Sequence, residues 1–144
     1  MSDTTVTGEP TGSRRTFLSI SKALTALFAV GVVVNFFLAG LGTYGMKGRI
    51  DDDKATTSFG AHRGVGSALT VVSLLLLISV AVARPGGRAL KLAGGLLLLM
   101  ILQNILAVAG TSTHVLGAFH ALTGVLVLGV AGLLAADIGA MRRR

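Results

Sequence analysis

Four long apolar stretches, separated by polar or charged connections, dominate the sequence. They cover residues 17–41, 58–83, 89–109 and 113–136, and each is about long enough to cross a hydrocarbon core of about 30 Å as a helix. A helix satisfies its own backbone hydrogen bonds in lipid, and these stretches lack the alternation of membrane β-barrel strands. The pattern therefore predicts an all-α fold, a polytopic membrane four-helix bundle.

The rest of the chain is short and polar. Residues 1–16 are rich in Thr, Ser and Gly without an apolar period, which predicts a disordered cytoplasmic tail. We expect one transmembrane domain over residues 17–139 and a basic cytoplasmic tail over residues 140–144. Residues 84–88 predict a tight turn between the second and third helices. The candidate N-caps are Thr57 or Ser58 for the second helix and Ser112 or Thr113 for the fourth.

Basic residues gather at one side of the predicted membrane domain. Nine lie at the ends that share a side with both termini, and four lie at the other side. The nine are Arg14, Arg15, Lys22, Arg84, Arg88, Lys91 and Arg142, Arg143, Arg144; the four are Lys47, Arg49, Lys54 and Arg63. The positive-inside rule then predicts a multi-pass protein of the cytoplasmic (inner) membrane with both termini in the cytoplasm. All three histidines would lie toward the outer face.

The composition restricts the class of protein and the kinds of binding site that are possible. Hydrophobic residues make up 52% of the 144 positions and charged residues only 13%, a balance that is typical of membrane proteins. The absence of cysteine excludes disulfides, thiolate metal sites and covalently attached c-type haem. The net charge of +7 comes from segment ends rather than from one basic patch with interleaved aromatics, so we expect no nucleic-acid binding.

Two parts of the chain resemble each other. Residues 35–43 align with residues 103–111, with Leu, Ala, Gly and Thr identical at four positions and Asn35 opposite Gln103. Each stretch is followed by a histidine that opens the next apolar segment. The alignment predicts two pseudo-symmetric helical hairpins, related by an axis along the membrane normal.

The two histidines carry the candidate chemistry. His62 and His120 open different membrane-length segments, and each is followed four residues later by a glycine, Gly66 or Gly124. Residues four apart share a helix face, and Gly117 lies on the same face as His120. Ionisable side chains at membrane depth are costly and usually functional. We therefore predict that the two imidazoles are the axial ligands of one haem, with the glycines leaving room for the porphyrin.

Several polar neighbours could support such a site. Arg63, beside His62, could pair with a haem propionate or could be an ordinary snorkelling arginine. Asn35, Gln103 and Asn104 could bond a ligand edge, bond the second nitrogen of a histidine, or bond between helices.

A zinc site is the other metal candidate. It would need four ligands, whereas His62, His114 and His120 have no obvious cysteine or glutamate partner in the sequence. His114 is six residues before His120 and about 120° away around the helix, so we expect an interfacial residue there.

The stretch Gly60-Ala-His62-Arg63-Gly64-Val-Gly66 resembles the His-Arg motif on the second helix of a four-helix half of the haem A synthase family. Leu102-Gln103-Asn-Ile-Leu-Ala and Gly117-Ala-Phe-His120-Ala-Leu resemble that family's third and fourth helices. A family of small uncharacterised prokaryotic four-helix membrane proteins shares the same outline. The resemblance implies a b-type haem between the second and fourth helices, with His62 and His120 as axial ligands.

The resemblance has limits. The catalytic half of the synthase has a glutamate just before its helix-two histidine and a cysteine pair in a loop; here Phe59 precedes His62, and cysteine is absent. We therefore expect no haem A synthesis and assign no catalytic residue.

The predicted function is that of a membrane b-type cytochrome that binds one haem b near the outer face. It would transfer electrons, with the lipid bilayer and a quinol or a redox protein as partners. The alternatives are a haem-free accessory or scaffold protein and an enzyme acting on a haem or lipid substrate. Small-residue faces leave homo-oligomerisation open.

Overall fold

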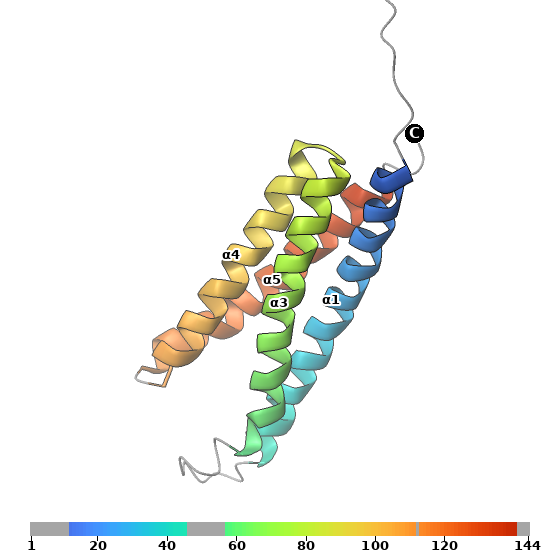
Figure 1. Ribbon diagram of the computed structural model, residues 1–144. Coiled ribbons are helices and arrows are strands. Elements are labelled where there is room, and N and C mark those ends of the chain that lie inside the picture. The colour runs from blue at the N-terminus through green and yellow to red at the C-terminus, as the bar shows by residue number, and fades with distance from the viewer. Residues whose placement is uncertain (1–11, 46–56, 112, 141–144) are drawn as a thin grey trace, which may run out of the picture.

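The computed structural model describes residues 12–45, 57–111 and 113–140, and the described chain is built from four helices (Figure 1). Their bounds are Gly12–Gly45 for α1, Gly60–Ala83 for α3, Gly87–Ala109 for α4 and His114–Ala140 for α5. Each helix is long and apolar enough to span a membrane. The predicted polytopic four-helix membrane bundle is therefore confirmed.

The helices pack in a closed ring in the order α1, α3, α4, α5. Helix α3 thus faces α5 across the centre, and α1 faces α4. Helices α1 and α4 run in the same direction, from the end that carries both described termini to the opposite end (Figure 1). We call the first end the basic end, because the described basic residues that share a side with both termini lie there. We call the second the histidine end, because His62 and His120 lie near it.

The burial pattern agrees with the predicted internal repeat. In α1 the buried positions 21, 25, 28 and 32 match positions 89, 93, 96 and 100 of α4 at an offset of 68. In α3 the buried positions 69, 73, 76 and 80 match positions 127, 131, 134 and 138 of α5 at an offset of 58. The hairpin of α1 and α3 is therefore equivalent to the hairpin of α4 and α5, as a parallel repeat about an axis along the bundle.

Helix α1 begins at Gly12, so residues 12–16 are helical rather than part of the expected tail. Arg14 explains the extension, because its side chain donates hydrogen bonds to the carbonyl oxygens of Ala83 (3.4 Å) and Arg84 (3.2 Å). These carbonyls are at the end of α3, where no further turn of helix can use them. Residues 1–11 and 141–144, assigned by sequence to the tails, lie outside the described residues.

The helix ends agree in part with the sequence prediction. The tight turn after α3 is present, with Arg84 in the left-handed region (φ 47°) and Gly86 at φ 144°. Thr113 caps α5 as expected, since its hydroxyl accepts from the backbone N–H of Leu116 (3.3 Å). The predicted caps for α3 were wrong: the cap position is Phe59, without a side-chain cap hydrogen bond. Phe59 instead packs beside Gly42 of α1.

The outside of the bundle is apolar. Large hydrophobic side chains are exposed on every helix, among them Leu27, Phe37, Leu74, Leu98 and Val125. A soluble protein rarely exposes apolar surface on this scale, whereas lipid covers it without cost.

Candidate functional site

The structure brings the two predicted ligand histidines together. His62 is on the first turn of α3 and His120 on the second turn of α5, and these helices face each other across the bundle. The imidazole ring centres are 6.1 Å apart, with the ring planes at 84°. Phe59 packs edge-on against His62, with ring centres 6.2 Å apart.

Each histidine is held by the carbonyl of a neighbouring helix. Nδ1 of His62 lies 3.0 Å from the backbone oxygen of Asn35 in α1, and Nδ1 of His120 lies 3.1 Å from the backbone oxygen of Gln103 in α4. A carbonyl oxygen can only accept, so each Nδ1 carries the proton and donates it. In the neutral imidazole this leaves the lone pair on Nε2, the nitrogen that remains available to a metal.

These two hydrogen bonds are equivalent under the repeat. Asn35 and Gln103 differ by 68 positions and His62 and His120 by 58, the same offsets that relate the buried positions of the two hairpins. The two histidines are therefore oriented by the same backbone geometry from opposite sides of the pseudo-twofold axis.

Side-chain amides occupy the space beside the two site glycines. An added Cβ at Gly66 would lie 3.5 Å from Nδ2 of Asn35, and one at Gly124 would lie 3.0 Å from Nε2 of Gln103 and 3.1 Å from the ring of Phe36. All of these neighbours are the far ends of side chains. The absence of a Cβ therefore lets the Gln103 amide approach closely at Gly124, whereas the contact at Gly66 is an ordinary van der Waals distance.

The amide oxygens of the two hairpins differ in their partners. Oε1 of Gln103 accepts from the hydroxyl of Thr123 (2.9 Å), one turn beyond His120. Oδ1 of Asn35 is buried and has no hydrogen-bond partner within the described chain. The position equivalent to Thr123 holds Val65, which has no hydroxyl. Sequence reasoning missed Thr123, although its place three residues after His120 on the same face was a usable signal.

The other candidates lie around this centre. Arg63 is exposed at the histidine end, next to His62. Gly117 lies against Gly110 where α4 passes into α5, since a Cβ on Gly110 would come within 3.0 Å of the Gly117 Cα. Asn104 bonds between helices, as one interpretation expected, and donates to the hydroxyl of Thr70 at 3.0 Å. The side chain of His114 lies outside the described residues.

Within the described ranges, three or more histidine, cysteine, aspartate or glutamate side chains nowhere gather to hold a metal ion. A structural zinc site usually has four protein ligands. A haem needs at most two, because the porphyrin supplies the remaining ligands. The donor set at the histidine pair therefore matches a haem better than a bare zinc ion.

A protein-family model matches part of the chain. A family described as a family of unknown function (DUF6220) matches residues 35–112, which include Asn35, His62 and Gln103. No curated protein and no solved structure matches the chain.

Proposed function

Because the chain belongs to the family of unknown function DUF6220, whose description assigns no activity, we propose a function from the geometry of the histidine pair. The protein is a membrane cytochrome in which His62 and His120 are the two axial ligands of one haem b. The single observation that carries the proposal is the facing pair of imidazoles, each of which donates its Nδ1 hydrogen to a backbone carbonyl oxygen.

The separation of the rings supports this assignment. One metal ion could lie between two imidazoles only if the rings were a few ångströms apart, because a metal–imidazole bond is about 2.0–2.1 Å long. The rings of His62 and His120 are 6.1 Å apart. Haem binding would require the ends of Asn35, Gln103 and Phe36, which now fill the space beside the glycines, to rotate away.

The supporting contacts are those that a metal-bound histidine needs. A ligand histidine almost always donates its second N–H to a carboxylate, a backbone carbonyl or water, which fixes the tautomer and the ring orientation. The carbonyls of Asn35 and Gln103 do this for His62 and His120. Arg63 would pair with a propionate at the rim of the site, where a guanidinium can form two parallel hydrogen bonds.

If His62 and His120 both held the haem, no position would be open for oxygen, which favours electron transfer over oxygen chemistry. Haem b supplies a one-electron redox centre when bound. The protein's own groups hold the histidine rings and surround them with apolar helices. We further propose that electrons come from a membrane donor such as a quinol, and that both termini are cytoplasmic, which puts the site near the outer face.

The test is spectroscopic. The full chain is purified from haem-replete cells, and reduced-minus-oxidised spectra are recorded for wild type, His62→Ala, His120→Ala and His114→Ala. We expect a low-spin b-type signature in the wild type and in His114→Ala, and its loss in each of the other two variants. Circular dichroism checks that the variants remain helical.

The other outcomes are informative. A folded, colourless wild type would overturn the proposal and favour a haem-free accessory protein. A haem that binds and is then chemically altered would favour an enzyme that acts on it. A signature that persists in both His62→Ala and His120→Ala would place the haem elsewhere.

A further inference from the structure

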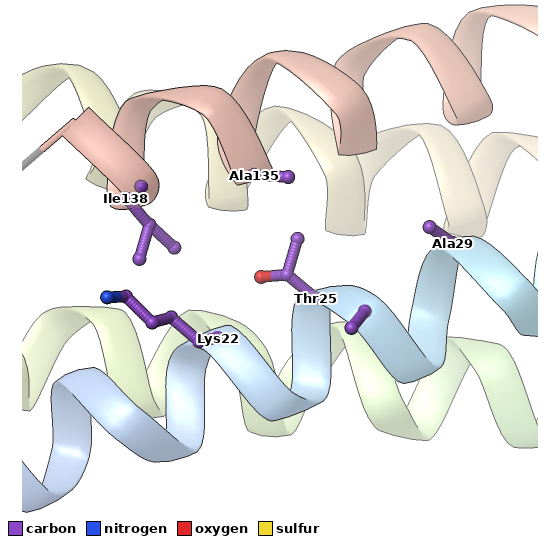
Figure 2. Close-up of a pocket in the computed structure, with 7 residues that line it drawn as sticks. Lys22, Thr25, Ala29, Ala135 and Ile138 are labelled. Carbon is purple, nitrogen blue, oxygen red and sulfur yellow. The ribbon is translucent and has the colours of Figure 1, made fainter.

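A cleft between α1 and α5 is the second candidate site of this molecule. It has a volume of about 550 Å³ and lies toward the basic end, away from the histidines. Figure 2 shows Lys22, Thr25 and Ala29 of α1 facing Ala135 and Ile138 of α5 across it. Ala26 and Gly139 complete the lining. The volume lies within the range of about 300–1,000 Å³ that is typical of small-molecule sites.

The repeat shows which side chains distinguish the cleft from the equivalent interface. The equivalent interface, between α4 and α3, has Leu97 at the position of Ala29 and Leu77 at the position of Ala135. Leu77 packs against the hydrophobic core, and Leu97 is half-buried. Two alanines where the other hairpin interface has leucines leave the space between α1 and α5 unfilled.

The same comparison singles out the lysine. Lys22 stands where α4 has Leu90, so the cleft has a cation where its counterpart has an apolar side chain. Figure 2 shows the ammonium group directed toward the end of α5, within the cleft. Among the residues that the structure describes, the cleft lining includes no acidic side chain, and Asp137, one residue before Ile138, pairs with Arg88 of α4 at 3.7 Å. The lining therefore offers a positive charge above an apolar groove.

The length of the groove matches part of a lipid chain. Lys22 and Ala29 are seven residues apart on α1, which is about 10 Å along the helix. The lining residues Ala26, Ala135 and Gly139 are exposed, so the groove opens on the outside of four helices that are long and apolar enough to span a membrane. Basic pockets between membrane helices are known to bind anionic lipid headgroups, most often on the cytoplasmic side.

We propose that this cleft binds one anionic phospholipid. The phosphate lies at Lys22, and an acyl chain lies along Ala26, Ala29 and Ala135, in the space that leucines fill at the equivalent interface. The bound lipid fills the interface between α1 and α5, which belong to different hairpins. This inference does not depend on the histidine pair.

Native mass spectrometry of the full chain in mild detergent tests the proposal. Phosphatidylglycerol, phosphatidylcholine with the same acyl chains, or inorganic phosphate is added, and retained ligand is counted. We expect one retained phosphatidylglycerol, weaker retention of phosphatidylcholine and none of inorganic phosphate. Lys22→Leu, which copies Leu90, should lower the preference for phosphatidylglycerol over phosphatidylcholine about fivefold, the effect of roughly 1 kcal/mol expected for one basic side chain near anionic lipid.

The cleft itself is tested by Ala29→Leu combined with Ala135→Leu, which copies Leu97 and Leu77. We expect loss of the retained lipid without loss of helicity, because the repeat already accommodates leucine at both equivalent positions. Lys91→Leu is the matched control for Lys22→Leu, since Lys91 is exposed on α4 near the same end. Unchanged phosphatidylglycerol retention in both cleft variants, or equal retention of the two lipids by wild type, would overturn the proposal.

Discussion

In the hairpin of α1 and α3, the small buried positions hold hydroxyl residues, whereas the hairpin of α4 and α5 has mainly alanine there. Ser21, Thr25 and Ser73 correspond to Ala89, Ala93 and Ala131, and all six are buried. The repeat therefore preserves side-chain size at these positions but not polarity. Small residues let membrane helices approach closely, and a hydroxyl can bond the carbonyl of its own helix at little cost in space.

The two hairpins also differ at the histidine end. In the second hairpin Thr123 satisfies the amide oxygen of Gln103, while in the first the equivalent oxygen of Asn35 has no partner in the described chain. The backbone contacts of the histidines are nevertheless the same. The orientation of the imidazoles thus depends on main-chain geometry, and the amide side chains are free to differ.

The largest difference between the hairpins is expected at the glycines near their histidine ends. A Cβ on Gly42 would meet the ring of Phe59, which can turn, whereas a Cβ on Gly110 would meet the backbone of Gly117 at 3.0–3.1 Å. Overpacking typically costs about 1–3 kcal/mol, with the high values where the neighbour cannot move. We expect Gly110→Ala to lower the free energy of unfolding by about 3 kcal/mol and Gly42→Ala by about 1 kcal/mol.

Unfolding in dodecyl sulfate, followed by circular dichroism, measures both values. Gly94→Ala is the control, because the space beside Gly94 is open. Equal losses for Gly42→Ala and Gly110→Ala would show that backbone contact at Gly117 does not distinguish the two ends.

A smaller loss of stability is expected when the second hairpin loses the hydroxyl that bonds the amide of Gln103. Thr123→Val keeps the shape of the side chain and makes its position identical to Val65, but leaves Oε1 of Gln103 without its donor. The loss should be about 1 kcal/mol, the lower range for an unsatisfied acceptor. Thr123→Ser, which retains the hydroxyl, should lose less in the same unfolding assay; a larger loss for Thr123→Ser would rule out the hydrogen bond as the cause.

The hydroxyl pair of the first hairpin is the next smaller contribution. Ser21 donates to the hydroxyl of Ser79 across α1 and α3 at 3.0 Å, and both residues are buried. Ser21→Ala copies Ala89 and should cost about 0.6 kcal/mol, the average for hydrogen bonds between membrane helices. Ser67→Ala, on the exposed face of α3, should be neutral in the unfolding assay. A neutral Ser21→Ala would mean that the pair contributes nothing to stability.

The fold and the meeting of the histidines could be predicted from sequence because each depends on a regular pattern. Length and apolarity identify four spans, and the alignment of Asn35 with Gln103 puts His62 and His120 in equivalent places. The extension of α1 could not be predicted, since it depends on Arg14 reaching the end of α3.

The hydrogen-bond acceptors of the two histidines could not be predicted from the sequence either. Every residue has a carbonyl, so no residue type indicates that those of Asn35 and Gln103 are the ones used. The cleft could not be predicted from the sequence either. Alanine is common in membrane helices, so alanines at positions 29 and 135 indicate a cleft only when α1 and α5 are known to be neighbours. The repeat becomes informative there only after the structure defines which interfaces are equivalent.

The smallest expected effect is a gain in stability. Val65→Thr in α3 copies Thr123 and places a hydroxyl one turn from His62, where Oδ1 of Asn35 is buried without a partner among the described residues. A new hydrogen bond there should raise the free energy of unfolding by about 0.5 kcal/mol. Val71→Thr, on an exposed position of the same helix, is the control. In a double-mutant cycle with Asn35→Leu the gain should vanish, since the acceptor is then absent. If Val65→Thr stabilises the protein equally well in the Asn35→Leu background, the hydroxyl is bonding its own helix backbone, and the hairpins do not differ in the way their amide partners suggest.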